Sequence, residues 1–83
     1  MQLLYFAWVR ERIGTGEETL SLPGEVTTVG QLLDWLAARG EQYAAALDQR
    51  SHIRVAVNQT YVGTDHPVSD GDEVAIFPPV TGG

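Results

Sequence analysis

The last six residues, 78–83, contain the group to which we assign the most distinctive chemistry in this sequence. The printed sequence ends in Gly82-Gly83, and a carboxylate carried on two residues without side chains can enter a channel too narrow for other residues. Pro78 and Pro79 have no backbone N–H, so we expect a strand to end before them and the chain to leave the sheet extended. The segment 80–83 (Val80, Thr81, Gly82 and Gly83) then reaches about 13 Å, at a maximum of roughly 3.3–3.6 Å per residue. We predict that the Gly83 carboxylate reacts in a cleft of a partner protein, with Pro78, Pro79, Val80, Thr81 and Gly82 threading into it.

Taken alone, a glycine pair at a chain end has a simpler interpretation, because termini are often frayed and tolerant of small residues. Other residue types supply no second reactive centre. The sequence has no cysteine, and its two histidines, His52 and His66, have no serine or carboxylate at an interpretable spacing. The acidic residues of segment 70–73 surround Gly71 and are typical of a turn rather than a metal site. We therefore expect no metal and no cofactor bound by this chain alone.

Length and charge limit the classes of partner. The chain has 83 residues, which suits a single domain with a modest core. Its net charge of −6 argues against nucleic-acid binding, which needs clustered Lys and Arg, and favours protein partners with basic surfaces. No apolar run is long enough to cross a bilayer, and the first residues lack the pattern of a signal peptide. We expect a cytoplasmic protein with no membrane partner.

Hydrophobic patterns predict five strands and two helices. The apolar residues 3–8 predict a central strand, followed by a helical turn over residues 9–13 that ends at Gly14. Alternation predicts strands over residues 18–22, 53–57, 60–62 and 73–77, with Asn58-Gln59 as a hairpin turn. A shorter helix is expected over residues 41–47.

The main helix is predicted to begin with a capping box. In this motif the Thr28 hydroxyl accepts from the Gln31 amide while the Gln31 side chain reaches back. Four apolar residues recur at i, i+3, i+4 and i+7 and define the buried stripe: Val29, Leu32, Leu33 and Leu36. Gly40 is predicted to end the helix after Arg39.

This order of elements predicts an α+β roll, in which a mixed sheet wraps around one main helix. We expect the first and last strands to lie together, parallel, in its centre. Residues 1–77 then form the domain and residues 78–83 an extended C-terminal Gly-Gly tail.

Two segments carry a resemblance to a known family: Val57-Asn58-Gln59-Thr60, and the last fourteen residues, Asp70-Gly71-Asp72-Glu73-Val74-Ala75-Ile76-Phe77-Pro78-Pro79-Val80-Thr81-Gly82-Gly83. With them the chain resembles, over its whole length, the small subunits of molybdopterin synthase, which are ubiquitin-like, β-grasp sulfur carriers. The last fourteen residues are the most specific part of this resemblance.

The resemblance implies a reaction at Gly83. An E1-like adenylyltransferase would use ATP to adenylylate the carboxylate, and sulfur from a sulfur-donor protein would then displace AMP to give a thiocarboxylate. The large synthase subunit, in a complex expected to be a heterotetramer, would use that sulfur to build the dithiolene of molybdopterin from cyclic pyranopterin monophosphate. The chain would then be a sulfur-donating subunit without an active site of its own. We also expect an apolar patch on the sheet beside the tail to bind its partners.

Two alternatives remain open at this stage. A sulfur carrier for thiamine synthesis or tRNA thiolation would use the same Gly-Gly chemistry, although the sequence Phe77-Pro78-Pro79-Val80-Thr81 favours the molybdopterin carrier. A ubiquitin-like protein modifier would use the tail to form bonds with lysines and would transfer no sulfur.

Overall fold

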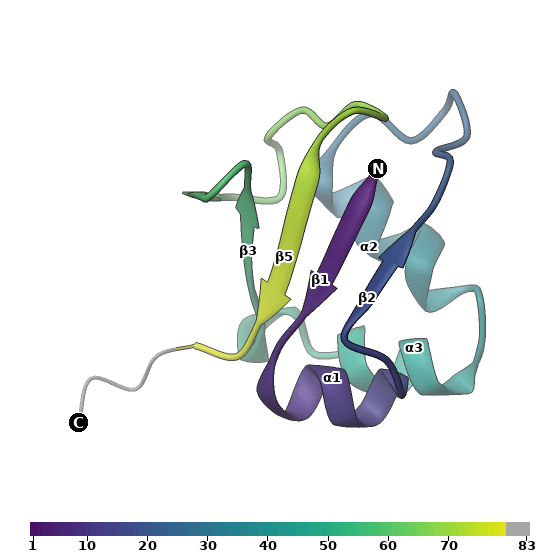
Figure 1. Cartoon of the computed structure of the whole chain (residues 1–83), viewed down its shortest axis with the longest axis vertical. Coiled ribbons are helices and arrows are strands. Elements are labelled where there is room, and N and C mark those ends of the chain that lie inside the picture. The colour runs from purple at the N-terminus through teal and green to yellow at the C-terminus, as the bar shows by residue number, and fades with distance from the viewer. Residues whose placement is uncertain (80–83) are drawn as a thin grey trace.

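The computed structural model describes residues 1–79, which form a five-stranded sheet with helices packed against it (Figure 1). The strands are β1 (Gln2–Tyr5), β2 (Glu17–Thr19), β3 (Arg54–Val57), β4 (Thr60–Val62) and β5 (Glu73–Phe77). They lie in the order β2-β1-β5-β3-β4. β1 and β5 are parallel neighbours, while the other three neighbouring pairs are antiparallel. The predicted mixed sheet, with its first and last strands adjacent and parallel, is confirmed.

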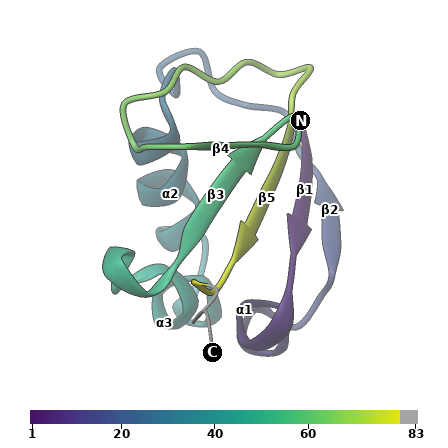
Figure 2. The same ribbon diagram turned by 90° about the vertical axis from the view of Figure 1, so that its left-hand side faces the viewer.

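Three helices and one 3-10 turn complete the fold: α1 (Ala7–Ile13), α2 (Val29–Ala37), α3 (Glu41–Leu47) and η1 (Arg50–His52). Figure 1 shows α2 behind the strands, and Figures 1 and 2 both show α1 and α3 near the end of the sheet at which β5 finishes. α1 packs against α3 and also contacts β5. The fold therefore places two short helices beside the point where the C-terminal segment leaves the sheet.

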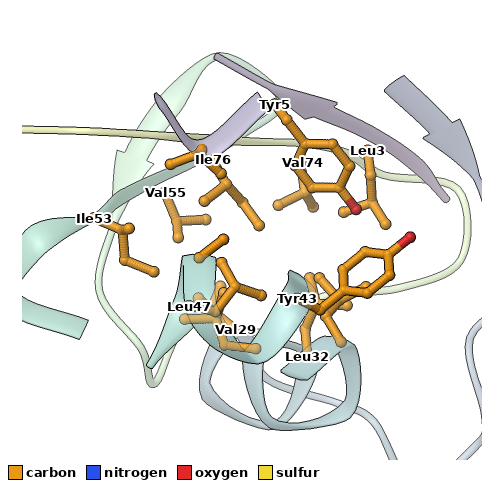
Figure 3. Packing of buried hydrophobic residues seen from close by; sticks show 14 of the residues in the cluster. Leu3, Tyr5, Val29, Leu32, Tyr43, Leu47, Ile53, Val55, Val74 and Ile76 are labelled. Carbon is orange, nitrogen blue, oxygen red and sulfur yellow. The ribbon is translucent and has the colours of Figure 1, made fainter. Parts of the chain in front are cut away.

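The buried face of α2 holds the core together. Its four predicted stripe residues have at most 1% of their surface exposed: Val29, Leu32, Leu33 and Leu36. Figure 3 shows Val29 and Leu32 facing the sheet residues Val55, Val74 and Ile76. Along β5, Val74 and Ile76 are buried and alternate with less buried residues, as expected for a strand with one face on the core. The stripe prediction is confirmed.

We expect Leu33→Ala to lower the free energy of unfolding by about 2–5 kcal/mol, because it removes buried methyl groups and leaves a cavity. Urea denaturation followed by circular dichroism measures the change. Asp34→Ala, at the neighbouring exposed position of α2, is the control and should cost much less. Equal stability of Leu33→Ala and the unaltered chain would contradict the packing described for α2.

The first strand is shorter than predicted. Residues 3–8 were expected to be extended, but β1 ends at Tyr5 and α1 contains Ala7 and Trp8. Ala7 has a φ of 53°, in the left-handed region, and this turns the chain away from the sheet. The predicted helical turn over residues 9–13 is therefore part of a longer helix. Its predicted end is confirmed, because Gly14 has a φ of 97° and donates its N–H to the Arg10 carbonyl.

The second strand was predicted over residues 18–22 and is observed over Glu17–Thr19. The Leu20 N–H still donates to the Met1 carbonyl at 2.9 Å, whereas the Leu22 N–H donates to the Asp70 carboxylate at 2.8 Å. Leu20 packs against the core cluster. The alternation of residues 18–22 thus reflects burial of the apolar side chains beyond the point where strand pairing stops.

One of the two hydrogen bonds predicted for the capping box of α2 is confirmed, and the other has a different donor residue. The Gln31 N–H donates to the Thr28 hydroxyl at 3.2 Å, as predicted. The Gln31 side-chain oxygen, however, accepts from the Thr27 N–H at 2.8 Å and from the Thr27 hydroxyl at 2.9 Å. Thr27 offers two donors to that oxygen where the Thr28 backbone would offer one.

The predicted end of α2 at Gly40 is wrong. The helix ends at Ala37, and Gly40 is instead the residue before α3, with an extended φ of 168°. Its carbonyl accepts from the Ala44 N–H at 3.0 Å, the first bond of α3. The shorter helix over residues 41–47 and the hairpin are confirmed. Asn58 and Gln59 have φ values of 51° and 70°, as a two-residue turn between antiparallel strands requires.

A hydrogen-bonded cluster around the Glu18 carboxylate joins the sheet to α3. The Tyr5 hydroxyl donates to it at 2.8 Å, the Tyr43 hydroxyl lies 2.8 Å from both of its oxygens, and Arg39 approaches within 3.3 Å. Burial alone would raise the pKa of Glu18, but these hydrogen bonds and the Arg39 charge together lower it. The ionised carboxylate is thus the form that stabilises the fold.

A group whose pKa is lower in the folded chain stabilises the fold above its unfolded pKa, and this contribution is lost as pH falls further. For Glu18 the loss should begin near its ordinary pKa of 4.5 and continue below it. We expect Glu18→Gln to be less stable at pH 7 by about 1–2 kcal/mol, from the loss of charge-assisted hydrogen bonds. The difference between the two proteins should shrink below pH 4.5, as measured by chemical denaturation across pH. A difference that stays constant down to pH 3 would contradict this assignment.

Candidate functional site

The tail leaves the sheet from its middle strand. β5 lies between β1 and β3, and its last register pairs join Ile76 to Tyr5 and Phe77 to Arg54. The strand ends at Phe77, where the prolines were predicted to stop it. Backbone hydrogen bonds therefore hold β5 on both sides up to its last residues. We call the end of β5, where the chain leaves the sheet, the exit point.

Of the predicted site residues, the structure places Pro78 and Pro79, both half-buried, next to the end of β5. Val80, Thr81, Gly82 and Gly83 lie outside the described residues. Threading by residues 78–82 and reaction at Gly83 stay predictions, as does the division into a domain of residues 1–77 and a tail of residues 78–83.

A hollow lies at the root of the tail, and we call it the root hollow. Pro78 and Pro79 line it together with Trp8, Arg12 and His52. Trp8 and Arg12 are four residues apart on α1, so they lie on the same helix face, with the Arg12 guanidinium carbon 4.8 Å from the centre of the Trp8 ring. His52 comes from η1, which is far from α1 in the sequence. Helix α1 and turn η1 thus both contribute side chains to the exit point.

Sequence reasoning missed the root hollow because it extended the first strand through Trp8. The available signal was the i, i+4 spacing of Trp8 and Arg12, which brings an indole and a guanidinium together only if the helix begins before Trp8. The large apolar residues at positions 3–8 suit a buried strand equally well, and they hid that signal.

An apolar surface adjoins the same exit point on the sheet face that points away from the core. We call this surface, formed by Leu4, Ala56, Tyr61, Ala75 and Phe77, the outer apolar face. Residues from four strands form one row across it, because Leu4 pairs with Ala75, Ala75 with Ala56, and Ala56 with Tyr61. Tyr61 is 73% exposed, and its ring centre lies 5.3 Å from that of Phe77. A large exposed aromatic side chain in such a row is typical of a protein-binding surface.

Two aspartates with shifted pKa values, Asp70 and Asp72, lie away from the tail root. Hydrogen bonds from the Leu22 N–H to Asp70 and from the Ser69 N–H to Asp72 lower the pKa of each carboxyl. Asp72 also accepts from the Asn58 side chain at 3.0 Å. Both aspartates lie in the turn before β5, at the opposite end of that strand from the tail. They stabilise this turn, in agreement with the turn interpretation of segment 70–73.

Within residues 1–79, no group of three or more His, Asp or Glu side chains is arranged to hold a metal ion. The described helices are also all too short or too polar to span a membrane. The features that remain for function are an apolar sheet face, a hollow with a cationic rim and the exit of the tail.

A mixed sheet with parallel first and last strands in its middle, covered by one main helix, defines the ubiquitin-like β-grasp class of domains. A solved structure of SAMP1 from Haloferax volcanii agrees with this class: it superposes with a TM-score of 0.74 at 32% identity, covering all of this chain and 98% of the other. The small archaeal modifier protein 1 of Methanosarcina acetivorans superposes with a TM-score of 0.69 at 30% identity, over 99% and 94% of the two chains.

The sequence pattern of the ThiS family matches residues 3–83, and the chain belongs to that family. Two curated relatives are both called molybdopterin synthase sulfur carrier subunit. The protein of Escherichia coli strain K12 is 46% identical over 83 residues, covering all of this chain and 99% of the relative. The human protein is 35% identical over 86 residues, covering all of this chain and 93% of the relative.

Proposed function

We propose that this chain is the sulfur carrier subunit of a molybdopterin synthase and that Gly83 carries the sulfur. The observation that supports this most directly is full-length similarity to curated sulfur carrier subunits, at 46% identity for the protein from E. coli. The end of β5 at Phe77, followed by Pro78 and Pro79, adds a physical reason, because two residues without a backbone N–H cannot continue the pairing of this central strand.

The chemistry begins with a carboxylate, which is a poor electrophile. Attack of the Gly83 carboxylate on the α-phosphate of ATP, within an E1-like adenylyltransferase, gives an acyl adenylate and releases pyrophosphate. A sulfide equivalent from a sulfur-donor protein then attacks the acyl carbon, displaces AMP and leaves a thiocarboxylate. In the large subunit its sulfur forms a bond to a carbon of cyclic pyranopterin monophosphate as a carbon–oxygen bond of that carbon breaks and its oxygen leaves as water or with the phosphate. Water then cleaves the acyl–sulfur bond, which regenerates the carboxylate and leaves the sulfur on the pterin. Two such deliveries build one dithiolene.

In this scheme the body of the chain binds and orients, while its partners supply the catalytic groups. The outer apolar face is suited to bind the large subunit, since Tyr61 and Phe77 present two adjacent, mutually tilted rings beside the tail. Docking of a rigid face next to the tail would fix the depth to which the tail enters a cleft. Gly83 would then arrive at a constant position relative to the pterin.

Deletion of Gly83 should abolish molybdopterin formation and leave the thermal midpoint nearly unchanged, because the described core lies within residues 1–79. The assay combines the chain with the large subunit, the adenylyltransferase, ATP and a sulfur source, and intact mass reports the thiocarboxylate. A variant with one extra residue after Gly83 is the matched control for length, and it should also be inactive because its carboxylate is out of register. Molybdopterin formation by the deletion variant would refute the proposal.

Tyr61→Ser should weaken binding to the large subunit by about tenfold or more, because exposed aromatic side chains often dominate protein interfaces. Its unfolding free energy should change by no more than about 0.5 kcal/mol, since Tyr61 is 73% exposed. Isothermal titration calorimetry gives the affinity. Gln59→Ser, in the adjoining turn, is a control that leaves the outer apolar face intact. Wild-type affinity of Tyr61→Ser would exclude this face from the interface.

A second candidate function is attachment of the Gly83 carboxylate to lysines of other proteins. It is favoured by one observation, the structural similarity to archaeal proteins named as small modifiers at 30% identity. Both functions pass through an activated Gly83, so the Gly83 deletion does not separate them. Mass spectrometry of cell proteins for Gly-Gly remnants on lysine distinguishes them, because sulfur delivery leaves none.

A further inference from the structure

The five arginines of the chain fall into two groups. Arg39 and Arg50 form ion pairs with Glu18 and Asp34, at 3.3 and 2.6 Å. Within residues 1–79, the other three, Arg10, Arg12 and Arg54, have no carboxylate oxygen within 4.0 Å, and all three are exposed. In a chain with a net charge of −6, cations without a carboxylate partner in the described part need an explanation.

Two of these three arginines, Arg12 and Arg54, lie at the root of the tail, whereas Arg10 borders a separate hollow. Arg12 borders the root hollow from α1, and Arg54 is the register partner of Phe77, the residue before Pro78. The Arg54 guanidinium donates to the carbonyls of Ser51 and Ile53, at 3.2 and 2.9 Å, which holds it close to η1. The turn at the other end of β5 carries Asp70 and Asp72. Charge is therefore distributed unevenly along β5: Arg12 and Arg54 lie at the tail end, and Asp70 and Asp72 lie at the other end, where Asp70 also pairs with the Met1 ammonium.

The surroundings of Arg12 favour an anionic guest. Its guanidinium stacks over the Trp8 ring, which fixes its position but leaves its N–H groups without a described carboxylate. Pro78, Pro79 and the Trp8 ring supply apolar walls, and His52 supplies a further nitrogen donor or acceptor. The nearby acidic residues are Glu11, adjacent in sequence, and Asp48, which lines an adjoining hollow shared with Trp8, Arg12 and His52.

We propose that the root hollow is a specificity pocket that receives a carboxylate side chain of the large subunit, paired with Arg12, when the tail enters that subunit. This inference rests on the proposed function. A glutamate or aspartate fits the chemistry because its methylene stem can contact the Trp8 and proline walls while its carboxylate accepts from the Arg12 guanidinium. The pocket is lined by Pro78 and Pro79, so a group bound there contacts the root of the tail directly.

This proposal changes the charges that we expect on the binding surface of the large subunit. The net charge of −6 by itself favours basic partner surfaces, whereas the root hollow calls for an acidic group at the mouth of the cleft that takes up the tail. Both forms of attraction weaken with salt, so salt dependence alone does not separate them. Removal of one positive charge from the chain does separate the two forms of attraction. It should strengthen binding to a uniformly basic surface and weaken binding to an acidic group.

The test is the affinity of the full chain for the purified large subunit, measured by isothermal titration calorimetry for Arg12→Gln, Arg12→Glu and the unaltered chain. We expect Arg12→Gln to bind about tenfold more weakly, with a smaller dependence on salt, and Arg12→Glu to bind more weakly still because like charges then face each other. Arg50→Gln is the matched control: it removes the same charge from η1, outside the root hollow, and should bind within about twofold of the unaltered chain. Circular dichroism and thermal midpoints should show that all variants fold.

Three results would overturn the inference. Arg12→Gln with unchanged or tighter binding excludes a carboxylate partner, and equal weakening by Arg12→Gln and Arg50→Gln indicates a general charge effect. In either case the proposed function stands, because the unaltered chain still binds the large subunit. If the unaltered chain does not bind that subunit at all, both this inference and the proposed function are wrong.

Discussion

The pairing of β5 on both sides is the constraint on which the rest of this structure depends. A strand at the edge of a sheet can fray, but β5 is held by β1 along one side and by β3 along the other. Its buried residues Val74 and Ile76 also anchor it to α2 and the core. The strand that precedes the tail is thus held on both edges and through its buried face, and Pro78 sets the point at which this support ends.

This arrangement separates two tasks that one short chain must perform. The segment that we propose to carry the reactive carboxylate would have to be thin and long enough to enter another protein, while the surface that selects that protein would have to be rigid. The outer apolar face and the root hollow both lie on the rigid part, and both adjoin the end of β5. Recognition can therefore take place at a fixed position relative to the base of the tail.

Charged side chains also differ between the two ends of β5. Asp70 and Asp72 accept backbone and side-chain hydrogen bonds in the turn before β5, so their charges serve the fold. Arg12 and Arg54 lie at the far end of the strand, without a carboxylate partner in the described part of the chain. A total charge of −6 does not describe the surface that a partner meets at the tail, because Arg12 and Arg54 lie there while Asp70 and Asp72 lie at the other end of β5.

Much of the fold could be predicted from local patterns. The stripe from Val29 to Leu36 repeats with the period of a helix, residues 73–77 alternate and are followed by two prolines, and Asn58-Gln59 has the residue types of a tight hairpin turn. Each of these signals depends on residues a few positions apart. Where patterns were ambiguous, the boundaries were wrong: Trp8 suits a buried strand or a helix face, and Gly40 suits the end of one helix or the beginning of the next.

For the candidate site, the sequence by itself determined which group we propose to react and where the strand must stop, because the glycine pair Gly82-Gly83 and the missing proline N–H are covalent properties of the chain. The tertiary structure alone decided what surrounds that place. Trp8 and Arg12 come from α1, His52 from η1 and Tyr61 from β4, and these residues meet around the end of β5 only because the sheet brings distant segments together. Such contacts depend on long-range packing, which no pattern of neighbouring residues encodes.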